Sequence, residues 1–166
     1  MTWTGAWPSL EIVNLRDALN NVVKLVDRPT HGQPDDVSRA LSRFLVVRAC
    51  GFLEQVAEEC CRSFIDSTTI PQVSAYGASW LGRGASPTPD HLVALVRRFD
   101  GTWADSLDAF LRTNDELLWR EIAFLVDRRN RIAHGLSEGI TGRKALDLAE
   151  YSAQVADWFV NRFDPR

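Results

Sequence analysis

The sequence lacks the features that mark a metal site, a membrane span or an extracellular protein. Only three cysteines occur among its 166 residues, Cys50, Cys60 and Cys61, and none lies in a C-x-x-C or C-x-x-H pair. This usage favours a reduced, cytoplasmic protein and argues against a zinc site. No apolar run approaches the roughly 18 residues of a membrane span, and the N-terminus has no basic or apolar signal region. We therefore expect no metal, no cofactor and no membrane partner.

An excess of positive charge is also missing. The 19 basic and 22 acidic residues give a net charge of −3, which argues against a broad basic surface that coats nucleic acid. However, Lys24 and Lys144 are the only lysines, so the other 17 basic residues are arginine. Residues 119–144 hold six basic and three acidic residues, net +3, whereas the rest of the chain is net −6. The sequence is thus compatible with one narrow, arginine-lined anion site.

Strand patterns are absent, and apolar residues recur at helical spacing along most of the chain. The spacing predicts helices over 9–28, 35–65, 88–99, 102–112 and 114–134, and a last helix that begins at Thr141. The Ser-, Thr-, Gly- and Pro-rich segment 66–88 is expected to be irregular apart from a short helix around Val73–Leu81. These patterns predict a single all-α domain over residues 1–166, a helical bundle with one long central helix and several shorter ones.

Polar residues at the expected helix starts support these boundaries. The predicted N-caps are Ser9, Thr88 before Pro89, Thr102 with Asp105 three residues later, Asn114 and Thr141. Gly135 follows the helix that starts at Asn114 and is expected at its C′ position, where a left-handed backbone is common.

Arg129 is the anomaly of that helix. At about 100° per residue, Leu118, Ile122 and Leu125 form one apolar sector, and Arg129 falls in its middle. A buried arginine is costly unless it is paired or faces a wet cleft. One interpretation is therefore structural, with Arg129 paired to a carboxylate such as Glu54. The other is functional, with Arg129 binding an anion in a cleft.

The residues that follow Arg129 strengthen the functional interpretation. Residues 129–135 read R-N-R-I-A-H-G, which resembles the signature of HEPN domains, an arginine followed after four residues by a histidine. Residues 44–56 (F-L-V-V-R-A-C-G-F-L-E-Q-V) and 89–111 resemble helices of the RiboL-PSP subgroup of this family. Together the resemblance covers about residues 37–160.

This resemblance implies a metal-independent endoribonuclease that acts as a homodimer, with the two motifs lining one cleft. The 2′-hydroxyl of RNA would attack the neighbouring phosphate and leave a 2′,3′-cyclic phosphate. His134 would be the general acid and base, Arg129 the phosphate clamp, and Asn130 the polar residue that orients His134 or the phosphate. Such proteins often serve as toxins or antiviral defence effectors, with an antitoxin or another protein as partner. Some carry a tyrosine two residues after the histidine for silencing by modification, but Leu136 stands there, so that route is not expected.

Other residues rank lower as site candidates. Arg131, Arg48 and Glu54 are possible substrate contacts, although ion pairs are the commoner role for the last two. His31 and His91 favour ordinary surface or structural positions. The tryptophans favour the core, and Trp80, in the irregular segment, is the one most suited to contact RNA.

Two further interpretations remain open. The chain is alternatively a non-catalytic HEPN-like interaction module that binds a partner protein or a nucleotide. It is also compatible with a generic helical bundle in which Arg129 only forms a buried ion pair.

Overall fold

The computed structural model describes residues 5–28, 32, 34–82, 86–136 and 139–166. Within these ranges the chain forms no strand and seven helices: α1 (Leu10–Asp27), α2 (Asp35–Thr68), α3 (Pro71–Ala78), α4 (Pro89–Arg97), α5 (Gly101–Leu111), α6 (Thr113–Ala133) and α7 (Gly142–Arg162). The prediction of an all-α protein is therefore confirmed. No described helix combines the length and the apolar character that a bilayer span requires.

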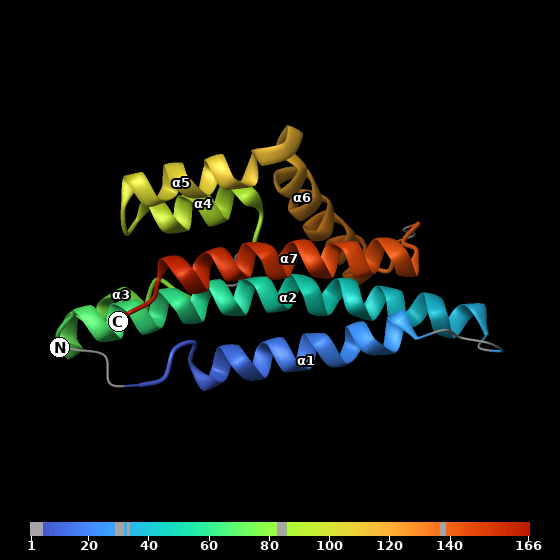
Figure 1. Ribbon diagram of the computed structural model, residues 1–166, viewed down its shortest axis with the longest axis horizontal. Helices are drawn as coiled ribbons and strands as arrows, with labels where there is room; N and C mark the ends of the chain where they lie inside the picture. Colours follow the sequence, from blue (N-terminus) through green and yellow to red (C-terminus); the bar gives the residue numbers. More distant parts are fainter. Residues whose placement is uncertain (1–4, 29–31, 33, 83–85, 137–138) are drawn as a thin grey trace.

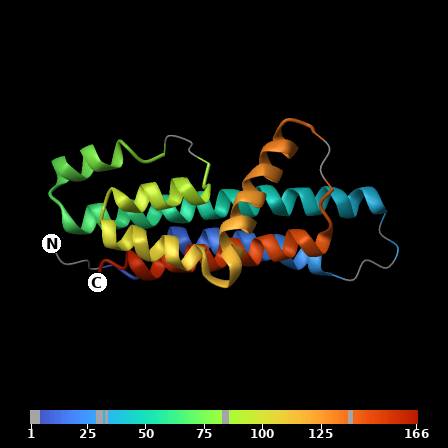
Figure 2. The same ribbon diagram turned by 90° about the horizontal axis from the view of Figure 1, so that it is seen from above.

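Helix α2 is the long helix around which the others are arranged. Its 34 residues extend for about 50 Å, and α1 and α7 run alongside it (Figure 1). Helices α4 and α5 pack against each other on the far side of α7, and α3 lies beside the C-terminal end of α2. Figure 2 shows that α6 does not follow this direction but crosses over α2 and α7. The last turns of α6, which carry the motif, thereby reach the middle of α2, where Arg129 pairs with Glu54.

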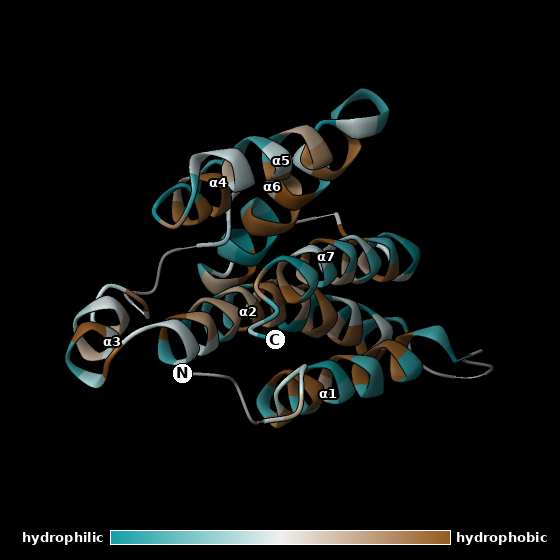
Figure 3. Cartoon of the chain, turned by 60° about the vertical axis from the view of Figure 1, so that its left-hand side comes forward, coloured by the Kyte–Doolittle hydropathy of each residue, from teal (hydrophilic) through white to brown (hydrophobic). Residues whose placement is uncertain are grey.

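The position of α2 explains its apolar composition. Leu45, Val46, Leu53 and Val56 have no exposed surface, because α1, α6 and α7 cover α2 from different sides. In Figure 3 apolar residues of α2 lie between the neighbouring helices, while hydrophilic residues mark much of the outer surface of α1. A helix covered in this way does not need one narrow apolar stripe.

An aromatic cluster joins the C-terminal end of α7 to α2, α4 and α5. Phe163 is fully buried at its centre. Its ring centroid lies 5.7 Å from that of Phe64, 5.1 Å from Phe99, 5.4 Å from Trp103 and 5.8 Å from Phe159. The first three pairs are edge-to-face and the last is stacked, and aromatic pairs at such distances add to the stability that burial itself gives.

Replacing Phe163 by alanine should therefore lower the free energy of unfolding by about 3–5 kcal/mol, because it removes a buried ring from this cluster and leaves a cavity. Urea denaturation followed by circular dichroism measures this change. Phe44, whose side chain is 49% exposed on α2, provides the matched control, and its alanine variant should lose less than about 1 kcal/mol. Equal losses for both variants would contradict the described core.

Most of the expected helix ends are found. The side chains of Ser9, Thr88 and Thr141 accept hydrogen bonds from the backbone N–H groups of Ile12, His91 and Lys144, respectively. The long helix predicted to end at residue 65 continues to Thr68, and the short helix expected around Val73–Leu81 is α3. The sequence thus identified the helices well and their ends to within a few residues.

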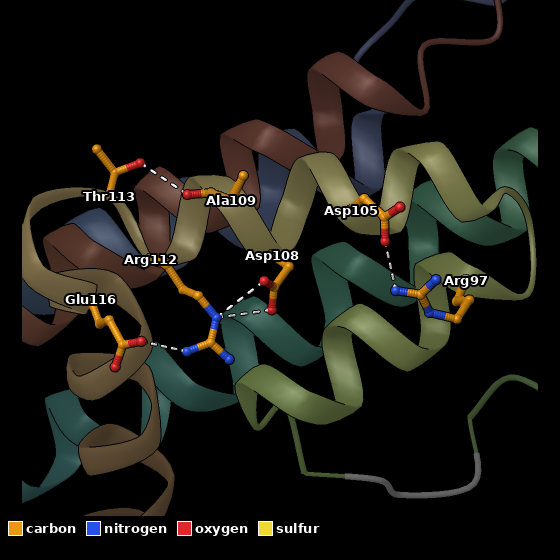
Figure 4. Close-up of polar contacts among 7 residues, drawn as sticks. All are labelled: Arg97, Asp105, Asp108, Ala109, Arg112, Thr113 and Glu116. Atoms are coloured by element: carbon orange, nitrogen blue, oxygen red, sulfur yellow. Dashed lines mark hydrogen bonds and ion pairs between the residues drawn. The ribbon is translucent and has the colours of Figure 1, made fainter.

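The predicted start of α5 at Thr102 is wrong. Asp100 is the N-cap, and its carboxylate accepts hydrogen bonds from the Trp103 N–H, at 2.9 Å, and from the Thr102 hydroxyl. These bonds, the Thr102 bond first, lower the pKa of Asp100. Asp105 takes no part in the cap and pairs with Arg97 of α4 at 2.9 Å (Figure 4). Asp and Thr are both good caps, and the earlier of the two serves here.

The predicted start of the motif helix at Asn114 also needs correction. Asn114, Asp115 and Glu116 have φ of 54°, 56° and 59°, so regular helix geometry resumes only at Leu117. Left-handed backbone at such residues costs free energy that neighbouring contacts must offset. Arg112 supplies such contacts: its guanidinium binds Asp108 and Glu116 (Figure 4) and lies 3.9 Å from the centroid of the Trp119 ring. This corner turns α6 away from α5 and towards α2.

Candidate active site

The last turns of α6 lie on α2 with the apolar sector facing inward. Leu118, Ile122, Leu125 and Val126 are buried, as the helical wheel predicted. Arg129 continues this sector, and its side chain is 28% exposed. The arginine is therefore neither fully enclosed nor directed into bulk solvent.

Arg129 contacts two different parts of the fold. One terminal nitrogen of its guanidinium, Nη2, donates a hydrogen bond to Ser86 Oγ at 3.3 Å, just before α4. The same nitrogen lies 3.8 Å from Glu54 Oε2 of α2, an ion pair slightly longer than a hydrogen bond. The pairing with Glu54 that the sequence suggested is thus present. Because a guanidinium has five N–H groups, these contacts orient it without using all its donors.

Cys50 is a third neighbour of Arg129. It lies one helical turn before Glu54 on α2 and is buried, and its thiol is hydrogen-bonded with Arg129. Burial raises the pKa of this thiol more than the hydrogen bond and positive charge of Arg129 lower it. The thiol therefore stays protonated at neutral pH, and Glu54 provides the negative charge beside Arg129.

His134 lies where α6 ends, and its backbone is held by the helix cap. The His134 N–H donates to the Asn130 carbonyl at 3.0 Å, Gly135 N–H to Ile132, and Leu136 N–H to Arg131 at 2.9 Å. With a φ of +67° at Gly135, this pattern is a Schellman motif, so the predicted C′ role of Gly135 is correct. The His134 side chain is exposed, and within the described ranges its imidazole makes no hydrogen bond or ion pair.

The structure brings some of the remaining candidates together and separates others. Asn130 and Arg131 are half-buried on the same turn of α6. Arg48 lies instead in a depression between α1 and α2, beside Leu15 and Phe52. Arg48 and Glu54 are six residues apart, which places them on different faces of α2, so Arg48 does not join the group around Arg129. His31 lies outside the described residues.

Sequence reasoning missed Ser86 and Cys50 as neighbours of Arg129. Cys50 could have been found, because it precedes Glu54 by four residues and therefore shares its helix face. Ser86 gave no such signal, since it lies in an irregular segment without periodicity. Among the described residues, no three His, Cys, Asp or Glu side chains are grouped so as to hold a metal ion.

Comparison with known proteins identifies the family. The model of the RiboL-PSP-HEPN family matches residues 10–163. No curated protein and no solved structure matches the chain. The matched region extends beyond the 37–160 range of the sequence resemblance and includes all of α1. The HEPN family suggests a nuclease or another RNA-related role. Because the match spans the chain from α1 to α7, this protein belongs to the RiboL-PSP-HEPN family of HEPN domains.

Proposed function

We propose that this protein is an endoribonuclease that cleaves RNA without a metal ion. The observation that carries this proposal is the arrangement at the end of α6. Arg129 is half-buried and oriented by Ser86 and Glu54, and His134, five residues later, has an exposed imidazole on a capped helix end. A fixed cation and an accessible acid–base group are what phosphodiester cleavage by an internal nucleophile requires.

The residues have distinct tasks in this reaction. The imidazole of His134 takes the proton of the 2′-hydroxyl, whose oxygen then attacks the adjacent phosphorus while the bond to the 5′-oxygen breaks. Arg129 binds the non-bridging oxygens, where negative charge grows in the transition state. A proton must be given to the departing 5′-oxygen. The products are a 2′,3′-cyclic phosphate and a 5′-hydroxyl, and Asn130 orients the phosphate or the imidazole.

The geometry of a single motif favours a site shared by two protomers. Arg129 and His134 are separated by about 7.5 Å along the helix axis and by about 140° around it, so their side chains diverge. Two proton transfers also need two acid–base groups, whereas one motif has one histidine. A two-fold homodimer brings a second His134 and a second Arg129 to the same cleft.

If two protomers share one active site, an inactive protomer should also inactivate the wild-type protomer with which it pairs. When about a tenfold excess of a His134→Ala variant is mixed and re-equilibrated with wild-type protein, cleavage per wild-type chain should fall about tenfold, because most wild-type chains then sit in mixed dimers. The same excess of serum albumin is the control. Unchanged cleavage per wild-type chain would contradict the shared site.

The biological role that fits such an enzyme is that of a toxin or antiviral defence effector in the cytoplasm, kept inactive by an antitoxin or another partner protein.

One observation favours a second function, a non-catalytic module that binds a partner protein or a nucleotide. Glu54 already balances the charge of Arg129, so the arginine has a structural task as well.

Product analysis tests the nuclease proposal. Purified protein is incubated with single-stranded RNA in EDTA, and the ends of the fragments are determined by mass spectrometry. We expect fragments with 2′,3′-cyclic phosphate and 5′-hydroxyl ends. An absence of cleavage together with a stable complex with a partner protein would favour the non-catalytic module.

A further inference from the structure

A cavity that the catalytic motif does not use lies beside Arg129. It is half-open, has a volume of about 230 Å³, and lies between α2, α4, residues 80–82 and Pro87. Its polar lining includes Glu54, Glu58, His91 and Arg98, and its apolar lining includes Leu92. An engineered cavity of about 150 Å³ holds benzene. The volume therefore suffices for a planar ring.

The cavity and the motif share one residue. Glu54 lines the cavity and also forms the ion pair with Arg129. Pro87, another lining residue, directly follows Ser86, whose hydroxyl accepts the hydrogen bond from Arg129. A group bound in the cavity is therefore next to any phosphate bound by Arg129.

Two carboxylates, those of Glu54 and Glu58, line the cavity together with the side chains of His91 and Arg98. Glu54 Oε2 faces Arg129, and Glu58 Oε1 lies 2.6 Å from the Arg62 guanidinium. The second oxygen of each carboxylate makes no hydrogen bond within the described ranges. Ionised carboxylates only accept, so they select ligands with N–H or O–H donors.

The chain segment on the other side of the cavity is fitted closely to Glu58. Gly82 has a φ of +71°, and a Cβ atom there would lie 2.9 Å from Glu58 Oε1. A larger residue would push the carboxylate aside, so glycine allows this close approach. Next to it, the Trp80 side chain is 49% exposed and packs edge-to-face on Tyr76 at a centroid distance of 6.2 Å. The cavity thus has an aromatic wall on its outer side.

We propose that this cavity is a nucleobase subsite for the nucleotide next to the cleaved phosphate, and that it selects bases with an exocyclic amino group. The proposal rests on the proposed ribonuclease function. Adenine, cytosine and guanine offer amino donors to Glu54 and Glu58, whereas uracil turns two carbonyl oxygens and a single N–H towards them. Trp80 contacts the face or edge of the base, as aromatic side chains do in single-strand binding proteins.

Two parallel measurements test this subsite. The first compares the cleavage rates of four RNAs that differ only in the base, A, C, G or U, beside the cut. The second measures the affinity of the His134→Ala protein for the four nucleoside 3′-monophosphates by calorimetry. Amino-bearing bases should be favoured over uracil by about tenfold or more in both.

Point variants test which residues of the cavity select the base. Glu58→Gln keeps the shape but adds a donor, so the preference against uracil should be smaller than in the wild type, with Glu54 still selecting for donors. Trp80→Ala should weaken binding of all four nucleotides about tenfold. The control is Glu59→Gln, because Glu59 binds Ser9 and Ser63 instead of lining the cavity. Circular dichroism establishes that all variants are folded.

The outcomes separate the two proposals. RNA cleavage with no base preference, and with Glu58→Gln indistinguishable from wild type, would overturn the subsite and leave the nuclease standing. Selective nucleotide binding that depends on Glu58, without cleavage of any RNA, would support the subsite and refute the nuclease. Equal binding of all four nucleotides by folded protein would refute the subsite whatever the cleavage result.

Discussion

The His134→Ala variant should cleave RNA about 10²- to 10⁴-fold more slowly than the wild type, because a positioned acid–base group contributes that much to such a reaction. In the structure this substitution removes the imidazole without breaking another described contact. The imidazole is exposed and contacts no described partner, and the helix cap is made by the backbone of His134 rather than by its side chain. The free energy of unfolding should therefore change by less than about 0.5 kcal/mol.

Initial cleavage rates on one RNA, measured with wild type and variant at equal concentration, check this prediction. Thermal unfolding of both proteins provides the stability control. Cleavage by the variant at the wild-type rate would show that His134 is not the catalytic histidine, even if the protein proves to be a nuclease.

The second large effect is expected at Arg129. Removing a donor that stabilises transition-state charge typically slows a reaction about 10²- to 10³-fold, and Arg129→Ala should do so here. Its contribution to stability is smaller. The ion pair with Glu54 is partly exposed and 3.8 Å long, so its loss should cost about 1 kcal/mol or less.

Two variants sharpen the interpretation of Arg129. Arg129→Lys keeps the charge but loses the planar fork, so it should recover only part of the activity. Arg120, exposed on the same helix, is the matched control, and its alanine variant should cleave normally. If Arg129→Ala instead unfolds the protein while its folded fraction keeps full specific activity, the role of Arg129 is purely structural.

The sequence predicted the helices of this protein because local signals determine them. Ser9, Thr88 and Thr141 cap helices through side-chain bonds to nearby N–H groups, and Gly135 ends α6 with a left-handed backbone. Such contacts span only a few residues, so a single sequence contains them. The apolar sector of α6 was predictable for the same reason.

Features that depend on tertiary contacts were predicted less well. The left-handed residues after Arg112 are maintained by its contacts with Asp108, Glu116 and Trp119, which no periodic pattern indicates. The residues of the site also differ in how far the sequence alone predicts them. Arg129 stood out on the wheel, and Glu54 was one of several possible partners, but only the fold brings Ser86 to the guanidinium.

In the proposed reaction the 2′-hydroxyl of the RNA itself attacks the phosphate, and the site needs no metal ion. The most direct measurement uses two oligonucleotides that are identical except for a single 2′-deoxyribose at the cut position, each incubated with wild-type protein in EDTA. The all-ribose oligonucleotide should be cut at this position, and the 2′-deoxy one should stay intact there. Equal cleavage of both would contradict the 2′-hydroxyl mechanism, and cleavage of neither would contradict the proposed activity.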